Sequence, residues 1–120
     1  MAKIVSIDDS KAVHAFLGEC FKETNHQVEH FTESPKGLEY VLDQKDTIDL
    51  VLLDWEMPEL TGPEVLTKLV EGGFTKPVIM LTSKNDVEDI ASVLEKGAKE
   101  YIMKPFTRDI VLEKISPFLK

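Results

Sequence analysis

Five side chains with charged or reactive groups each follow a short apolar run of this 120-residue sequence. Three are carboxylates, one is a hydroxyl and one is an amine: Asp8 and Asp9 after residues 3–7, Asp54 after 50–53, Thr82 after 77–81, and Lys104 after 100–103. Carboxylate oxygens are the ligands that a hard cation such as Mg²⁺ prefers, and no histidine or cysteine stands at these positions to favour zinc. A carboxylate can also attack phosphorus and form an aspartyl phosphate, while an amine and a hydroxyl can neutralise and orient phosphoryl oxygens. The residue types therefore indicate phosphoryl transfer assisted by a divalent cation.

The apolar runs alternate with stretches of helical periodicity, which predicts an α/β protein. We expect strands at 3–7, 27–31, 50–53, 77–81 and 100–103, and helices at about 11–22, 34–42, 62–72, 83–97 and from 107 almost to the C-terminus. This (βα)₅ order with short connections predicts one domain over residues 1–120. Its fold is a doubly wound, five-stranded parallel sheet with helices on both faces.

Polar residues mark the positions where three of these helices are expected to begin. Ser34, followed by a proline, is predicted to be the N-cap of the second helix. Ser83, with Asp86 three residues later, resembles a capping box for the fourth helix. Thr107 is predicted to cap the fifth helix.

The predicted sheet brings the five polar side chains together. In open parallel sheets the ligand crevice lies beyond the carboxyl ends of the strands, which is where all five residues stand. Each residue alone has a simpler explanation, because an aspartate often caps a helix or forms a turn, and a lysine is usually solvated. The prediction of a site rests on the complete set, in which three neighbouring carboxylates would raise one another's pKa unless a cation is present.

Composition narrows the class of protein. The formal net charge of −8 argues against nucleic acid as a direct partner, because nucleic-acid binding depends on lysine and arginine to neutralise phosphates. No apolar run reaches the roughly 18 residues that a membrane span needs. The single cysteine, Cys20, cannot form an internal disulfide, which fits a reducing compartment. We therefore expect a cytoplasmic protein that does not bind membranes.

Four segments resemble the receiver domains of response regulators: IDDS at 7–10, LLDWEMP at 52–58, MLTS at 80–83 and YIMKPF at 101–106. The resemblance extends from residue 3 to about 119, and the length resembles that of the stand-alone, CheY-like members of the family. It implies a flavodoxin-like, CheY-like sheet with strand order 2-1-3-4-5. It also implies a phosphorylation-activated switch of a two-component, His-Asp phosphorelay system. Such a protein is a phosphoacceptor that catalyses only its own phosphorylation and dephosphorylation.

The resemblance implies a role for each acidic residue. Asp54 would accept a phosphoryl group from a histidine kinase, a phosphotransfer protein or a small donor such as acetyl phosphate. Asp9 and Asp54 would bind Mg²⁺ directly, together with the backbone carbonyl of Glu56. Asp8 would act mainly through a metal-bound water.

The resemblance also implies how phosphorylation would be transmitted. Lys104 would pair with a phosphoryl oxygen, and the Lys104–Pro105 peptide bond is expected to be cis. Thr82 would move to bond the phosphoryl group, and Tyr101 would then swing inward. The fourth helix, fifth strand and fifth helix would present the change to a downstream protein.

Two positions that vary within the family are expected to modulate the site. They are Glu56, two residues after Asp54, and Lys84, two residues after Thr82. We hypothesise that the two side chains form an ion pair over the mouth of the site, which would screen the acyl phosphate from water. Two solvated side chains with a weak mutual attraction are an equally good interpretation.

Several alternatives remain open at this point. An aspartate-nucleophile phosphatase of the haloacid dehalogenase type fits poorly, because its second aspartate is replaced by Glu56 and its motif would lie on the third strand. A flavodoxin-like cofactor binder lacks a glycine-rich phosphate loop. A degenerate receiver used only for interaction would not need the complete acidic set.

The pathway is also open. Chemotaxis through a flagellar motor switch, with a dedicated phosphatase, competes with relay in a phosphotransfer chain. Met1 and a complete last helix favour a stand-alone protein over a receiver excised from a larger regulator.

Overall fold

The structure is a computed structural model that describes residues 2–119, which form five β-strands and five α-helices in strict alternation. The strands form one parallel sheet with the order β2-β1-β3-β4-β5, as the resemblance implied. The strands are β1 Lys3–Ile7, β2 Gln27–Phe31, β3 Leu50–Asp54, β4 Val78–Thr82 and β5 Glu100–Met103. The predicted α/β, doubly wound, five-stranded parallel sheet is therefore confirmed.

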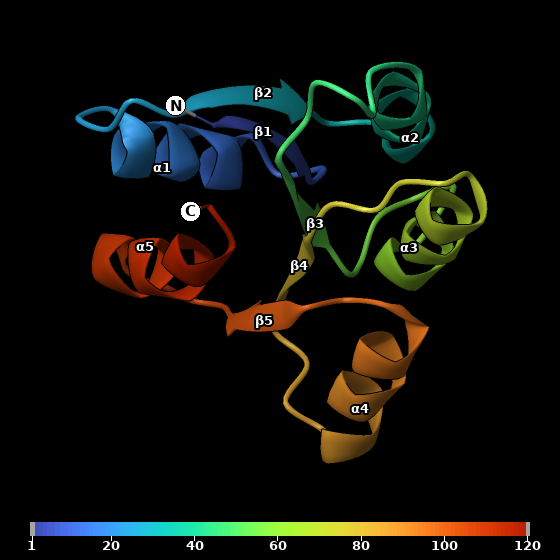
Figure 1. The fold of residues 1–120 in the computed structure, drawn as a ribbon. Coiled ribbons are helices and arrows are strands. Elements are labelled where there is room, and N and C mark those ends of the chain that lie inside the picture. The colour runs from blue at the N-terminus through green and yellow to red at the C-terminus, as the bar shows by residue number, and fades with distance from the viewer. Residues whose placement is uncertain (1, 120) are drawn as a thin grey trace.

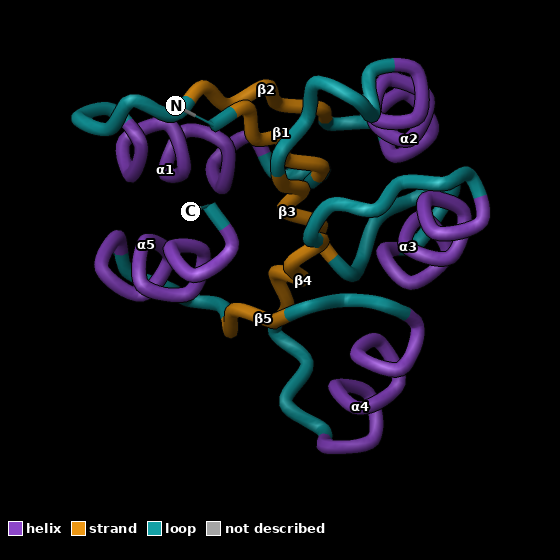
Figure 2. Tube along the Cα trace, in the orientation of Figure 1, coloured by secondary structure: helices purple, strands orange, loops and turns teal. Residues whose placement is uncertain are grey.

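The helices cover both faces of the sheet (Figure 1). One face carries α1 and α5, and the other carries α2, α3 and α4, so the sheet lies between two helical layers (Figure 2). The helices are α1 Lys11–Phe21, α2 Ser34–Asp43, α3 Gly62–Glu71, α4 Val87–Lys96 and α5 Arg108–Ile115, and the short 3₁₀ helix Ser116–Phe118 follows α5. Within residues 2–119, every helix is too short or too polar to traverse a lipid bilayer.

The central strands β3 and β4 are buried along their whole length, which explains their continuous apolar sequences. Successive side chains of a strand point to opposite faces. Val51 and Leu53 of β3 accordingly pack in the core beneath α2 and α3, while Leu50 and Leu52 pack in the core beneath α1 and α5. This double burial fixes the position of the residue at which β3 ends, Asp54.

The start of α2 differs from the prediction. Glu33 is the N-cap, and Ser34 is the first residue of the helix. The Ser34 hydroxyl does not cap the helix, because it donates to the carbonyl of Pro58 at 3.1 Å and accepts the N–H of Leu60 at 3.2 Å. A side chain predicted to have a local role therefore holds the loop between β3 and α3.

The predicted capping box at Ser83 is wrong. Helix α4 begins at Val87, and its N-cap is Asp86, whose carboxylate accepts the N–H of Glu88 at 2.9 Å. The chain before it is held in a turn, because the Thr82 hydroxyl oxygen accepts the N–H of Lys84 at 2.8 Å. The predicted cap Thr107 is confirmed by its bond from the N–H of Ile110.

Candidate functional site

Three carboxylates meet at the carboxyl ends of β1 and β3. Asp8, Asp9 and Asp54 each offer an oxygen, and the three atoms lie within 4.8 Å of one another. The parallel register that pairs Ile7 with Leu53 brings these residues side by side. Asp8 and Asp54 are buried, with 0% and 5% of their surfaces exposed, whereas Asp9 is open to solvent. This all-oxygen cluster fits a hard divalent cation in the number and type of its donors.

Lys104 reaches this cluster from the end of β5. Its ammonium group lies 2.8 Å from Oδ1 of Asp54 and 3.1 Å from Oδ2 of Asp8. The backbone N–H of Lys104 donates to the carbonyl of Thr82 at 2.8 Å, which ties the lysine to the end of β4. The Lys104–Pro105 peptide bond is cis, as the resemblance implied. All five side chains that stood at predicted strand ends thus lie at one edge of the sheet.

The charges in the cluster are not balanced. Burial raises the pKa of Asp54 to about 6; the hydrogen bond from Lys104 opposes this shift, and the charges of Asp8 and Asp9 add to it. Burial lowers the pKa of Lys104, but its bonds to Asp54 and the charges of both carboxylates outweigh burial and raise that pKa overall. One ammonium group therefore does not offset three carboxylates, and a bound cation would supply the missing positive charge.

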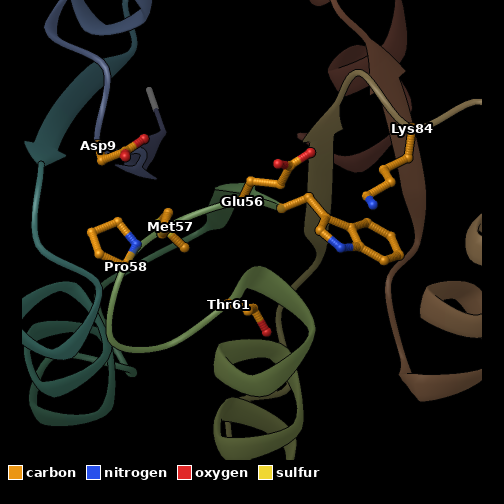
Figure 3. A pocket seen from close by; sticks show the side chains of 7 residues that line it. Asp9, Glu56, Met57, Pro58, Thr61 and Lys84 are labelled. Atoms are coloured by element: carbon orange, nitrogen blue, oxygen red, sulfur yellow. The ribbon is translucent and has the colours of Figure 1, made fainter.

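A solvent-exposed pocket of about 510 Å³ opens beside the acidic cluster (Figure 3). Its lining combines acidic, apolar and basic side chains: Asp9, Trp55, Glu56, Met57, Pro58, Thr61 and Lys84. Figure 3 shows Glu56 and Lys84 on different walls of this space. The pocket therefore makes the cluster accessible from solvent.

The expected ion pair between Glu56 and Lys84 is absent from the described part of the chain. Ion pairs within 4.0 Å in residues 2–119 join Lys36 to Glu33, Lys114 to Glu100, and Lys104 to Asp8 and Asp54. The Lys84 ammonium instead lies 5.9 Å from the centroid of the Trp55 ring, within the range of a cation–π contact. The indole face offers this ammonium a partner that is partly shielded from water.

The two expected switch residues lie on neighbouring strands. Thr82 is buried at the end of β4, with its hydroxyl bonded to the N–H of Lys84. Tyr101 is half-buried on β5 and packs at the margin of the core beneath α2 and α3. The Lys114 ammonium lies 5.4 Å from the centre of the Tyr101 ring. Thr82 thus ends the strand next to that of Asp54, and Tyr101 pairs with Met80, two positions before Thr82.

The segment after Asp54 contains supporting residues that the sequence reasoning missed. Thr61 caps α3 in a capping box with Glu64, a pattern that the Thr-x-x-Glu spacing could have revealed. Gly62 has no room for a side chain, because a Cβ would overlap the carbonyl oxygen of Asp54. Together these residues hold the loop against the end of β3.

The sequence profile described as "Response regulator receiver domain" matches residues 4–116. The chain belongs to this family. It is 31% identical over 121 residues to the chemotaxis protein CheY of Listeria monocytogenes, with each chain covered in full. It is 33% identical over 113 residues to the transcriptional regulatory protein DltR of Streptococcus agalactiae, which covers 94% of this chain and 50% of DltR. This receiver domain therefore spans about half the length of such transcriptional regulators.

Solved structures give the same result for the fold of this receiver domain. The CheX–CheY–BeF3–Mg²⁺ complex from Borrelia burgdorferi contains a chain that matches with a TM-score of 0.92 and 26% identity. The match covers 99% of this chain and 90% of that one. A receiver domain protein from Clostridium thermocellum matches with a TM-score of 0.91 and 27% identity, covering 99% and 94%. The chain is therefore a receiver domain with a CheY-like fold, and such domains are phosphorylation-activated switches.

Proposed function

We propose that Asp54 is the phosphoacceptor of this receiver domain and that Mg²⁺ assists the transfer. The observation that carries the proposal is the convergence of Lys104 and the carboxylates of Asp8 and Asp9 on Asp54. Burial and neighbouring negative charge hold the pKa of Asp54 near 6, so this carboxylate is ionised at neutral pH but poorly stabilised. A poorly stabilised carboxylate gains from bonding to an electrophile, which suits it to act as a nucleophile.

The cation would be held by oxygen atoms of this chain. Asp9 and Asp54 would hold it directly through their carboxylates, the backbone carbonyl of Glu56 would be the third donor, and Asp8 would act mainly through a water. When bound, Mg²⁺ supplies positive charge that neutralises the carboxylates and the transferred phosphoryl oxygens. Asp9 lines the pocket and is exposed, which lets a hydrated ion enter from solvent.

The transfer itself needs one bond to form and one to break. An Asp54 carboxylate oxygen attacks phosphorus, the bond from phosphorus to the histidine nitrogen of the donor breaks, and the leaving imidazole takes up a proton. Lys104 already donates to Asp54 Oδ1. After transfer, its ammonium group would be close enough to donate to an oxygen of the phosphoryl group on Asp54. Thr82 contributes a hydroxyl at the neighbouring strand end.

Phosphorylation would act on the segment that joins β4 to α4. A phosphoryl group adds roughly −1.5 to −2 charges and three strong acceptors, and it shifts the equilibrium only through contacts that differ between the two states. Thr82 would exchange its bond with the Lys84 N–H for one to the phosphoryl group, and Tyr101 would move inward. The face formed by α4, β5 and α5, where Val87 and Ile110 are exposed, would present the change.

The partners follow from this chemistry. We propose a histidine kinase or phosphotransfer protein as donor, a downstream protein as target, and a phosphatase that shortens the phosphorylated state. The flagellar motor switch is one candidate target, since the full length of a Listeria chemotaxis protein matches this chain. Relay to another phosphotransfer protein, or control of a DNA-binding output domain as in transcriptional regulators, remains as the alternative.

The test is the intact mass of the protein after incubation with acetyl phosphate and Mg²⁺. Wild type and the exposed control Asp46→Asn should gain one phosphoryl group, and Asp54→Ala should gain none. The proposal fails if wild type is never modified, or if Asp54→Ala is modified equally. A phosphatase would instead release phosphate from a generic ester over many turnovers.

A further inference from the structure

A buried histidine lies directly behind the acidic cluster. His14 is on the first turns of α1 and only 7% of its surface is exposed. Its Nε2 lies 2.6 Å from the carbonyl oxygen of Asp8 and 3.2 Å from the carbonyl oxygen of Phe31. The same Phe31 oxygen accepts the backbone N–H of Asp8 at 3.0 Å. One imidazole thus joins the ends of β1 and β2 at the residue where the acidic cluster begins.

The surroundings of His14 determine which ring nitrogen carries hydrogen. Both neighbours of Nε2 are carbonyl oxygens, which only accept, so Nε2 must be the donor. In the neutral ring Nδ1 is then an acceptor, and it lies 2.9 Å from Nδ1 of His30 and 3.3 Å from the hydroxyl of Ser6. Ser6 and His30 are paired across β1 and β2, so the strand register places both donors behind the ring.

The pKa of His30 agrees with this arrangement. Burial is the largest cause that lowers the pKa of His30, which favours its neutral ring. A neutral His30 can donate from Nδ1 to the acceptor Nδ1 of His14. The rings are 4.6 Å apart between centroids, which keeps the two imidazoles in contact as well as hydrogen-bonded. The His14 ring is therefore held at both nitrogens: two carbonyl oxygens contact Nε2, and two donors contact Nδ1.

The remaining bonds of Asp8 show what this fixation does. Oδ1 of Asp8 accepts the N–H of Ser10 at 2.8 Å, and Oδ2 accepts Lys104 at 3.1 Å. The backbone carbonyl of Asp8 has His14 as its side-chain donor. Without that donor, the carbonyl of a fully buried residue would lose a strong partner, and the turn that carries Asp8 and Asp9 could rotate.

We propose that His14 is a positioning residue for the acidic cluster, which holds the Asp8 backbone so that the Asp8 and Asp9 carboxylates face the cation. The inference rests on the Mg²⁺ site proposed above. His14 does not contact a carboxylate of the cluster, so it acts through Asp8 alone. Groups that orient metal ligands in this way typically change metal affinity by about 10- to 100-fold when they are removed.

The experiment compares two substitutions of similar size in the full chain. His14→Gln keeps an N–H donor that can reach the Asp8 carbonyl, and His14→Met does not. Mg²⁺ is titrated while the fluorescence of Trp55, the only tryptophan and a residue of the pocket, is followed. The backbone amide NMR shifts of Asp8 and Asp9 give a second readout, and urea unfolding reports whether each variant is folded.

We expect His14→Met to weaken Mg²⁺ binding by about tenfold or more, and His14→Gln to retain most of the affinity. The control His26→Gln should bind as wild type does, because His26 serves the opposite end of the sheet by accepting the N–H of Ala2.

Each outcome decides between the two proposals. If wild type binds Mg²⁺ and folded His14→Met binds it equally, the positioning role is overturned and the metal site stands. The same conclusion follows if His14→Gln is folded but binds no better than His14→Met. If His14→Met is unfolded, His14→Gln decides by keeping or losing wild-type affinity. If wild type itself binds no Mg²⁺, both proposals fail.

Discussion

The ammonium of Lys104 donates a 2.8 Å hydrogen bond to Oδ1 of Asp54, although the two residues are 50 positions apart and one strand lies between theirs in the sheet. Lysine therefore occupies the space beside the proposed phosphoacceptor before any cation or phosphoryl group binds. The contact is an ion pair with only 24% and 7% of the two side chains exposed. It makes Lys104 both a stabilising partner of the apoprotein and an electrostatic competitor of Mg²⁺.

Lys104→Met should weaken the apoprotein and strengthen its affinity for Mg²⁺. Removing one partner of a buried ion pair leaves uncompensated charge, so we expect a loss of about 3 kcal/mol in the free energy of unfolding at pH 7. Mg²⁺ should restore much of this loss, because the ion no longer meets a neighbouring ammonium. Urea unfolding with and without MgCl2 measures both effects. Lys36→Met, which breaks only an exposed pair with Glu33, should change neither quantity.

Asp54→Asn should stabilise the apoprotein at neutral pH. Burial raises the pKa of Asp54 to about 6 in the folded state, above the ordinary value of 3.8, so the folded protein binds this proton more tightly than the unfolded chain does. The ionised carboxylate therefore lowers the free energy of unfolding above pH 6 by about 3 kcal/mol, and the asparagine variant avoids that loss.

The pH dependence of this difference is the decisive measurement. The gap between the variant and wild type should be full above pH 6, shrink as the pH falls from 6 to 4, and vanish below about pH 4, where Asp54 is protonated in both states. Urea unfolding across this range, without Mg²⁺, measures it. A gap that is constant with pH would contradict the raised pKa.

Gly62→Ala should damage the loop that follows Asp54. A methyl group there would overlap the Asp54 carbonyl oxygen and approach Met80 Cε at 2.8 Å, so the backbone would have to shift. We expect a loss of about 3 kcal/mol in the free energy of unfolding, with slower phosphorylation of the folded fraction. The matched control is Gly18→Ala on the exposed side of α1, where no atom lies within 4 Å. That change should stabilise the protein by about 0.5–1 kcal/mol.

Glu56 and Lys84 should affect the lifetime of the phosphorylated state independently. Both line the pocket, but Lys84 lies over Trp55 and forms no ion pair with Glu56. If each side chain shields the acyl phosphate separately, Glu56→Ala and Lys84→Ala should each speed dephosphorylation, and their effects should multiply in the double variant. The loss of phosphoryl mass with time measures the rates. An unchanged rate in the double variant would show that neither residue shields the site.

The acidic cluster could be predicted from sequence because strand ends are easy to locate in a buried parallel sheet. The apolar run before Asp54 ends where β3 ends, and the topology then carries Asp8, Thr82 and Lys104 to the same edge. The ends of buried strands can be located because the spacing and length of apolar runs are visible in a single sequence.

The side-chain contacts were less predictable. Ser34 and Ser83 are both of a residue type that often caps helices. The Ser34 hydroxyl instead bonds to Pro58, 24 residues away, and the chain at Ser83 lies in a turn in which Thr82 accepts the N–H of Lys84. The Lys84 ammonium lies over the Trp55 ring and forms no ion pair with Glu56. His14 gave no signal at all, because its partners come from β1, β2 and the turn before α1. Contacts of this kind are chosen by tertiary packing and not by local spacing.

The Ser34 hydroxyl has a mechanical consequence. By bonding to both Pro58 and Leu60 it braces one wall of the site to α2, and α3 adds four buried residues to that wall. On the other side of the pocket, the segment of Lys84 leads into α4, which buries only Val93. A structural change that begins at Asp54 would therefore meet less resistance in the segment between β4 and α4 than in the loop between β3 and α3.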